Sequence, residues 1–262
     1  MDAIEGWLEA TGLPAGVRGG TATRRFAGIS GLPYGRANYG ERCGDAADAV
    51  ARNRALLREL LGLGSEPVWL RQVHGVEVVA IDAGTKSSGA SSARPEHGCA
   101  VREADACIVR GSGLAAVVQT ADCLPILLAA TDREEVAAIH AGWRGLAAGV
   151  IEATLARMSA APASIHAWLG PAIGQSAFEV GPEVRAAFVI ADPGAAQCFQ
   201  PGRDDRWHAD LPGLARRRLG ALGVRQISGG DGCTVAAPAQ FHSFRRDGAR
   251  SGRMATLVWR SR

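Results

Sequence analysis

The stretch LAAVVQTADCLPILLAATDREEVAAIHAGWRG, residues 114–145, sets the expected fold. It holds three apolar runs, Leu114–Gln119, Ile126–Ala130 and Val136–His140. Each run is short and apolar, as expected for a buried strand, and only brief connections separate them. The stretch therefore predicts three strands that follow one another closely.

Outward from this stretch, strands and helices interleave without a regular period. Further strands are predicted at Pro67–Val73, Val76–Ile81, Ala106–Arg110, Ile165–Leu169, Val224–Ser228 and Ala255–Trp259. Helices are predicted at Asp45–Leu61, Leu146–Met158, Pro182–Ile190 and Leu211–Leu222, the first with Asp45 as its N-cap and Gly62 at its end. Strands outnumber helices and do not form a βαβ repeat. The pattern therefore predicts an α+β fold, with mixed sheets and helices packed outside them.

Composition excludes several classes of protein. Hydrophobic residues make up 47% of the 262 residues and charged residues 21%, which is typical of a folded domain. The net charge of +3 is too mild to predict a nucleic-acid-binding protein. Apolar runs such as Leu124–Ala130 are far shorter than the roughly 20 residues that span a membrane. Residues 84–98, GTKSSGASSARPEHG, are predicted to be a flexible insertion on the surface.

The cysteines and the start of the chain indicate a compartment. The six cysteines contain no C-x-x-C pair, which argues against a disulfide framework. Residues 1–12 carry acids and no basic apolar block, so a secretory signal is not expected. These features predict reduced thiols and a cytoplasmic protein.

Common catalytic motifs are absent. The sequence has no G-x-x-x-x-G-K-[ST], no G-x-G-x-x-G, no H-E-x-x-H and no G-x-S-x-G. Phosphate-binding loops, dinucleotide-binding folds, zinc peptidases and α/β-hydrolases therefore lose support.

Three polar segments each follow a predicted strand, namely Arg71–Gly75, Thr120–Pro125 and His140–Gly145. Strand ends can bring side chains together at a pocket while a rigid sheet holds them. His74, Cys123 and His140 are suitable zinc ligands, and three ligands leave a position for water or substrate. Copper accepts the same donors. Taken alone, a histidine or cysteine at a strand end is more often a packing residue or a satisfied core polar group than a metal ligand.

The HAGWRG segment has a second interpretation. A helix is expected to begin near Leu146, and a helix N-terminus favours an anion. Arg144 and Arg71 are therefore candidates for holding a phosphate, and Trp143 could stack on a base. A solvent-facing arginine and a core tryptophan remain open alternatives. Asp122 is a candidate proton carrier or a residue that positions a ligand.

Several segments resemble the YfiH-type family, whose members have been called polyphenol oxidase or laccase-domain proteins, peptidoglycan editing factors and purine nucleoside phosphorylases. The segments are RQVHG, ADACIV, TADCLPILL, HAGWRGLAAGV, WLGPAIG and RRDGARSGRMATLVW. The resemblance runs from about Thr23 to Trp259. It implies a single domain over residues 1–262, with mixed sheets sandwiched by helices, and zinc held by His74, Cys123 and His140.

The resemblance also implies an activity. Phosphorolysis of adenosine, inosine, guanosine or methylthioadenosine would yield a base and ribose 1-phosphate, and adenosine would be deaminated. Cys123, His140 and Asp122 are then the catalytic candidates. Arg71, Arg144 and Trp143 are the candidates for binding substrate and phosphate. The expected partners are a purine nucleoside and phosphate, without nucleic acid or membrane, and the expected state is a monomer or small homo-oligomer.

Other functions stay open at this point. With Cys123 as nucleophile and His140 as base, the protein would be an amide hydrolase that edits peptidoglycan precursors. Copper-dependent oxidation of phenols ranks lower, because a multicopper oxidase needs more histidine ligands than the six histidines here supply. A metal-binding or docking role without catalysis is the remaining alternative.

Overall fold

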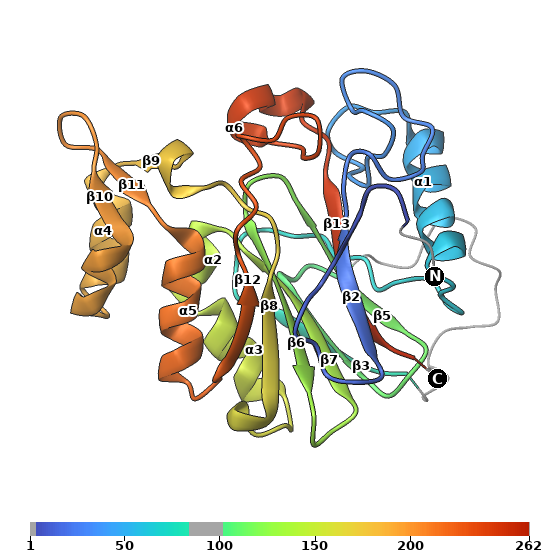
Figure 1. Ribbon diagram of the computed structural model, residues 1–262, viewed down its shortest axis with the longest axis horizontal. Helices are drawn as coiled ribbons and strands as arrows, with labels where there is room; N and C mark the ends of the chain where they lie inside the picture. Colours follow the sequence, from blue (N-terminus) through green and yellow to red (C-terminus); the bar gives the residue numbers. More distant parts are fainter. Residues whose placement is uncertain (1–3, 84–101, 262) are drawn as a thin grey trace.

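The computed structural model describes residues 4–83 and 102–261 (Figure 1). The predicted insertion at residues 84–98 lies outside the described residues. Among the described residues, no helix combines the length and apolar character needed to cross a membrane.

A six-stranded mixed sheet carries the stretch that began the sequence analysis. Its strands are β3 (Val78–Asp82), β4 (Ala106–Arg110), β6 (Leu124–Ala130), β7 (Glu135–Ala141), β8 (Ile165–Leu169) and β12 (Gln226–Gly229). The order is β12-β8-β6-β7-β4-β3, parallel at the two outer pairs and antiparallel between them. β6 and β7 are buried along their whole length, as their apolar sequences predict.

A four-stranded antiparallel sheet packs against the first. Its strands are β1 (Trp7–Glu9), β2 (Val17–Ala22), β5 (Ala115–Thr120) and β13 (Met254–Arg260). The order is β1-β2-β13-β5. Because β5 belongs to this sheet and β6 to the other, the chain crosses from one sheet to the other at Ala121–Cys123.

The two sheets and the helices form a layered sandwich, which confirms the predicted α+β fold. Val118 and Val258 of one sheet meet Leu127 and Ala138 of the other in a shared core. The outer face of the six-stranded sheet is covered by α2 (Trp143–Ala148), α3 (Val150–Arg157), α4 (Pro182–Val189) and α5 (Leu211–Ala221). The outer face of the four-stranded sheet is covered by α1 (Ala47–Leu60).

Two helix predictions need correction. The N-cap of α1 is Ala46, without a side-chain cap. Asp45 instead accepts hydrogen bonds from Ser30 Oγ at 2.6 Å and Asn38 Nδ2 at 3.0 Å, so its carboxylate is used outside the helix. The helix predicted at Leu146–Met158 is two helices, α2 and α3, because Gly149 adopts a φ of 99° that ends the first.

One predicted strand is absent from the structure, and several strands, β2 among them, were not predicted. Pro67–Val73 forms only isolated bridges, from Val68 to Ala116 and from Arg71 to Glu103. Strand β2 lies outside the predicted strands, because glycine is depleted in strands and Gly19-Gly20 interrupts the strand pattern. A Cβ on Gly20 would lie 2.3 Å from the carbonyl oxygen of Leu8, so close packing against β1 requires glycine there.

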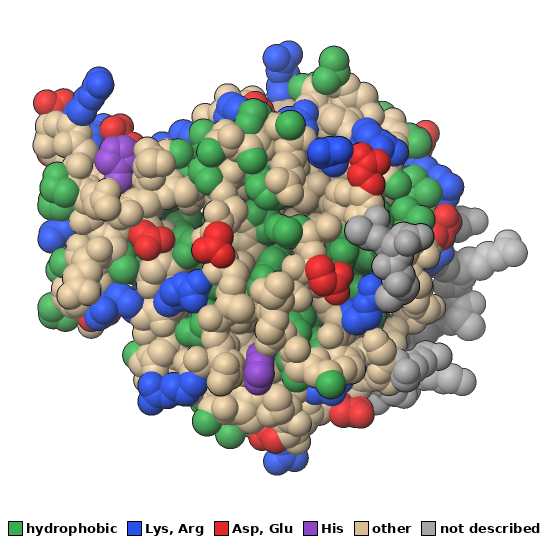
Figure 2. Space-filling view, viewed as in Figure 1, with side chains coloured by type: hydrophobic (Ala, Val, Ile, Leu, Met, Phe, Trp, Pro, Cys, Tyr) green, Lys and Arg blue, Asp and Glu red, His purple; other side chains and the backbone are tan. Residues whose placement is uncertain are grey.

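A three-stranded antiparallel sheet lies at the far side of the molecule. It comprises β9 (Glu179–Val180), β10 (Phe199–Pro201) and β11 (Trp207–Ala209). Together with α4 it projects from the body as an arm, at the left of both views (Figures 1 and 2). Val180 and Phe199 join it to the core of the six-stranded sheet. The short helix α6 (Phe244–Asp247) lies near the top of Figure 1, toward the end of the chain.

Candidate active site

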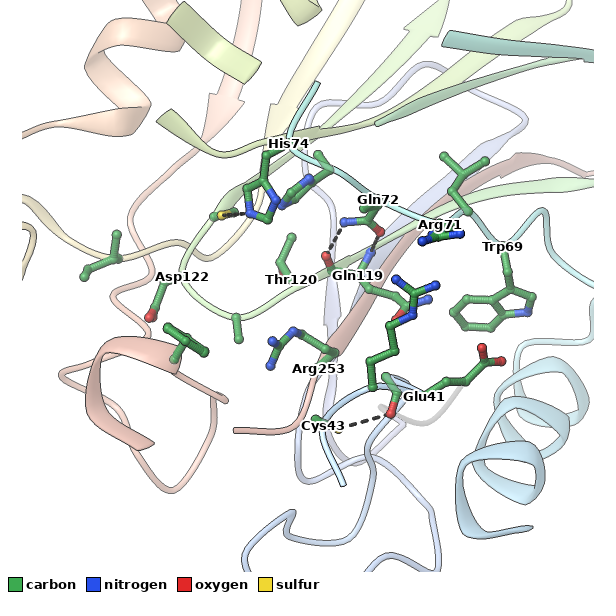
Figure 3. Close-up of a pocket in the computed structure, with 18 of the residues that line it drawn as sticks. Glu41, Cys43, Trp69, Arg71, Gln72, His74, Gln119, Thr120, Asp122 and Arg253 are labelled. Carbon is green, nitrogen blue, oxygen red and sulfur yellow. Dashed lines mark hydrogen bonds between the residues drawn. The ribbon is translucent and has the colours of Figure 1, made fainter. Parts of the chain in front are cut away.

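His74, Cys123 and His140 come together from three separate segments. His74 lies in the loop before β3, Cys123 in the crossing between the sheets, and His140 near the end of β7. The potential ligand atoms all lie within 4.8 Å of one another. Cys123 Sγ is 3.8 Å from His74 Nε2, the contact drawn in Figure 3, and the two imidazole rings meet edge to face at 4.7 Å. Among the described residues, this is the one group of three such side chains close enough to share an ion.

Close backbone approach makes this convergence possible. A Cβ on Gly142 would lie 2.9 Å from Cys123 Sγ and 3.0 Å from His74 Cδ2. A Cβ on Gly145 would lie 2.9 Å from the carbonyl oxygen of Gly75. The glycines of HAGWRG therefore leave room for the other two segments. His74 itself has a φ of 64°, a left-handed conformation that is uncommon outside glycine and concentrates at functional sites.

Asp105, which the sequence analysis did not select, organises the cluster. Its fully buried carboxylate lies 2.8 Å from His140 Nδ1 and accepts hydrogen bonds from the backbone N–H groups of His74 and Gly75, at 2.9 and 2.6 Å. The backbone of Asp105 also accepts from the His140 N–H at 2.7 Å. With Nδ1 bonded to Asp105, the Nε2 atom of His140 is the one left for a ligand or substrate. An acid directly before the apolar run of β4 was the available sequence signal.

Electrostatics in the cluster favour a thiolate. Burial raises the pKa of Cys123, but His140 and His74 outweigh that effect and bring it down to about 6. Burial lowers the pKa of His140, but Cys123 and Asp105 outweigh it and raise that pKa to about 9. These neighbours favour a thiolate on the half-buried Cys123 and a proton on the buried His140.

A cavity of about 450 Å³ opens in front of the cluster, between the ends of the two sheets and the loop before α1 (Figure 3). Five arginines line it, namely Arg42, Arg54, Arg71, Arg245 and Arg253. The acidic side chains on its wall are Glu41 and Asp122. The cavity is therefore positively charged and suits an anionic ligand.

Asp122 lines the cavity, but both of its oxygens are already used. One accepts from Thr234 Oγ1 and the other from the backbone N–H of Arg245 at 2.6 Å. Asp122 also has a left-handed φ of 86°. The structure thus places Asp122 as an anchor between the Cys123 turn and α6.

Trp143 and Arg144 do not line the cavity. Trp143 packs against the core of the six-stranded sheet, and the exposed Arg144 lies over its ring at 4.5 Å. The helix that they begin, α2, has six residues. Of the two arginines that the sequence suggested for phosphate, Arg71 is the one that reaches the cavity.

Comparison with known proteins gives consistent matches. The family described as "Multi-copper polyphenol oxidoreductase laccase" matches residues 20–261. A protein of Xylella fastidiosa (strain Temecula1) named "Purine nucleoside phosphorylase" is 47% identical over 251 residues, covering 94% of this chain and 93% of that protein. "Purine nucleoside phosphorylase YfiH" of Escherichia coli K12 is 45% identical over 247 residues, covering 94% and 95%.

Solved structures agree with these matches. Protein NMB0706 of Neisseria meningitidis has a TM-score of 0.87 and 39% identity, covering 98% of this chain and 100% of that one. YlmD of Geobacillus stearothermophilus has a TM-score of 0.89 and 30% identity, covering 100% and 98%.

Proposed function

The chain belongs to the family described as multi-copper polyphenol oxidoreductase laccase, and from this premise we propose that it is a zinc-dependent purine nucleoside enzyme. It converts adenosine, inosine, guanosine or methylthioadenosine, with phosphate, to the free base and ribose 1-phosphate, and it deaminates adenosine. The names of its relatives supply the substrate class. The observation that carries the proposal is a three-ligand cluster at the base of an arginine-lined cavity.

The residues present fit a zinc ion. Two imidazoles and a thiolate are typical zinc donors, and three protein ligands leave a position for catalysis. Asp105 orients His140, and Gly142 leaves the space that a side chain would fill. His74, Cys123 and His140 would hold the ion, and an ion held there supplies a Lewis acid next to the substrate.

Copper binds the same donors at least as tightly, so the identity of the donors does not by itself determine which metal is bound. We favour zinc because phosphorolysis and deamination involve no change in oxidation state. A multicopper oxidase also needs further histidine ligands, and the described residues offer a single cluster of three.

Arginines of the cavity are suited to hold the phosphate. Arg71 forms a loose 3.5 Å ion pair with Glu103, and both side chains are about half exposed, so Arg71 is free to reorient. Arg253 uses Nη1 for backbone carbonyls at 2.7 and 3.0 Å, and no hydrogen bond from its guanidinium Nε or Nη2 is found among the described residues. In phosphorolysis a phosphate oxygen bonds to C1′ of the ribose, the C1′–N9 bond breaks, and its electron pair leaves with the base. Catalysis then depends on positioning and charge stabilisation.

The test is an incubation of metal-quantified protein with adenosine, with and without phosphate, followed by chromatography. We expect adenine and ribose 1-phosphate only with phosphate, and inosine without it. Arg71→Ala should raise the KM for phosphate about tenfold, as expected for one charge-assisted hydrogen bond. Arg144→Ala is the matched control and should leave it within about twofold. No product from protein that carries one zinc per chain would overturn the proposal.

A Cys–His amide hydrolase acting on peptidoglycan precursors is the second candidate. The observation favouring it is geometric: the Cys123 Sγ lies within 4.8 Å of His140, which Asp105 orients through a 2.8 Å contact. The two histidines also lower the pKa of Cys123 to about 6. The thiolate would bond to the amide carbon, and the amine would leave with a proton from His140. Water would then attack the thioester, releasing the acid and restoring the thiolate. Chelation separates the candidates, because amide hydrolysis would survive removal of the metal while the nucleoside activities would not.

A further inference from the structure

Most polar side chains on the cavity wall are already hydrogen-bonded within the protein. Arg54 and Arg245 donate to backbone carbonyls, and Asp122 accepts two hydrogen bonds. Gln72 is engaged as well, since its amide donates to the C=O and accepts from the N–H of Gln119, each at 2.7 Å. Groups with unused hydrogen-bonding capacity are therefore informative about the ligand.

Gln119 is such a group. Its backbone is held by Gln72 on one side and by pairing with Ala255 of β13 on the other. Its side-chain amide lines the cavity and has no hydrogen-bond partner among the described residues. The hydroxyl of Thr120, the next residue on this wall, is buried and also lacks a partner within the described part of the chain. A firmly placed backbone thus presents an unused amide to the cavity.

Trp69 lies on the same cavity wall as Gln119, with the Arg54 guanidinium 4.0 Å over its ring. Side chains alternate along a strand, so Gln119 points to the same face of β5 as Val117. Val117 belongs to a hydrophobic core cluster with Tyr39, and Trp69 packs against that cluster. Trp69 and Tyr39 are stacked, with ring centroids 6.3 Å apart, and Trp69 lines the cavity. Figure 3 shows Gln119 between His74 and Trp69.

The chemistry of the amide matches the neutral part of a nucleoside. The arginines suit phosphate and the His–Cys–His cluster suits a metal, so the base and the sugar remain to be recognised. An amide carries one acceptor and two donors on a single plane. It pairs with the 6-amino group and N7 of adenine. A 6-oxo purine presents acceptors at both O6 and N7, so after rotation by half a turn the N–H₂ group donates to O6 and the amide oxygen turns away from the base.

Resting on the proposed function, we propose that Gln119 binds the purine base at its 6-substituent, and also at N7 when that substituent is an amino group. It is the residue that lets one site accept both 6-amino and 6-oxo purines. A carboxylate at this position would accept from a 6-amino group but would repel a 6-oxo group and N7.

The test uses the metal-loaded full chain and two variants, Gln119→Met and Gln119→Glu. Binding of free adenine and free hypoxanthine is measured by titration calorimetry, which requires no turnover, and phosphorolysis of adenosine and inosine is measured separately. Gln119→Met should weaken both bases about tenfold and raise both KM values, with kcat within about threefold, as expected for one or two neutral hydrogen bonds. Gln119→Glu should weaken hypoxanthine about tenfold more than adenine. Gln226→Met, an exposed glutamine on β12 outside the cavity, is the matched control.

An unchanged adenine-to-hypoxanthine ratio in Gln119→Glu would overturn the proposal, as would equal losses that point to the ribose. If wild type binds the bases through Gln119 but phosphorolyses no nucleoside, the proposed function fails while base recognition stands. If wild type binds neither base, base recognition fails even where nucleosides are turned over.

Discussion

Two buried carboxylates lie at opposite ends of the antiparallel pair β4–β7, and they are held in the same way. Asp105, just before β4, meets His140 Nδ1 and backbone N–H groups of the His74 loop. Glu135, at the start of β7, accepts from Arg110 Nε at 2.7 Å and from the backbone N–H groups of residues 159 and 160, at 2.7 and 2.9 Å. Burial raises the pKa of each carboxyl, but these donors outweigh burial and lower both pKa values.

The two carboxylates differ in whether the side chain that they bind, Arg110 or His140, keeps a nitrogen that can bind a metal or a proton. Arg110 donates to Glu135 and to the carbonyl oxygen of Arg157 at 2.9 Å, and a guanidinium has no lone pair for a metal or a proton. His140 bonds to Asp105 with one nitrogen and turns the other toward Cys123 and the cavity. The same buried carboxylate therefore supports structure at one end and a reactive site at the other.

Cys123→Ala alters only the metal-binding cluster near Asp105, and it has the largest expected effect on activity. With one of three ligands lost, we expect no bound zinc and a fall in kcat/KM of more than about 1,000-fold. The fold should persist, because Cys123 lies in a turn. Metal analysis, nucleoside turnover and circular dichroism measure the three outcomes. Cys43→Ser, on the same cavity wall, is the control, and turnover in a metal-free Cys123→Ala protein would contradict the proposal.

Asp105→Asn disturbs the positioning of the ligands while keeping all three. One oxygen becomes an N–H₂ group that faces backbone N–H donors of the His74 loop, so that loop and His140 lose their fixed orientation. We expect zinc affinity and kcat/KM to fall about 10–100-fold. Competition with a chromogenic chelator gives the affinity. An unchanged affinity would show that Asp105 does not orient the cluster.

Glu135→Gln should lower the stability of the fold and leave the activity unchanged, which is the opposite of what is expected for Cys123→Ala. It leaves Arg110, one-third exposed, with only the longer 3.7 Å ion pair to Asp82, and it turns an N–H₂ group toward donors that Glu135 had accepted from. We expect the free energy of unfolding to fall by about 2 kcal/mol, since a partly exposed pair loses less than a fully buried one. Urea unfolding measures this loss. The kcat/KM for adenosine should remain within about twofold of wild type, and a large loss of activity would mean that the two ends are coupled.

The smallest expected effect is the pH dependence of the unfolding free energy that Glu135→Gln loses. The folded-state pKa of Glu135 lies below its ordinary value of 4.5, so its contribution is complete above pH 4.5 and is lost as pH falls through the lower folded value. The stability gap between wild type and Glu135→Gln should therefore be constant from pH 7 to about 5.5 and narrow below 4.5. Unfolding curves across this range test it, and a gap that widens at low pH would reverse the assigned sign.

Much of the fold followed from local pattern. β4 and β8 have the predicted bounds, and β6 and β7 extend the predicted runs by one or two residues, because continuous apolar runs bury both faces of a central strand. The YfiH-type resemblance is confirmed by the family match over residues 20–261. Strand β2 was not predicted, because its Gly20 is required by close packing against β1, a contact between separate segments of the chain.

The sequence by itself identified His74, Cys123 and His140, because their donor chemistry is a property of the residue types and of the motifs around them. Only the tertiary structure determined which other residues surround these three side chains. It brought Asp105 beneath His140, turned Gln119 toward the cavity and left Arg144 outside it. The physical reason is that ligand chemistry is local, whereas burial, hydrogen-bond partners and shared cavities depend on which distant segments the two sheets bring together.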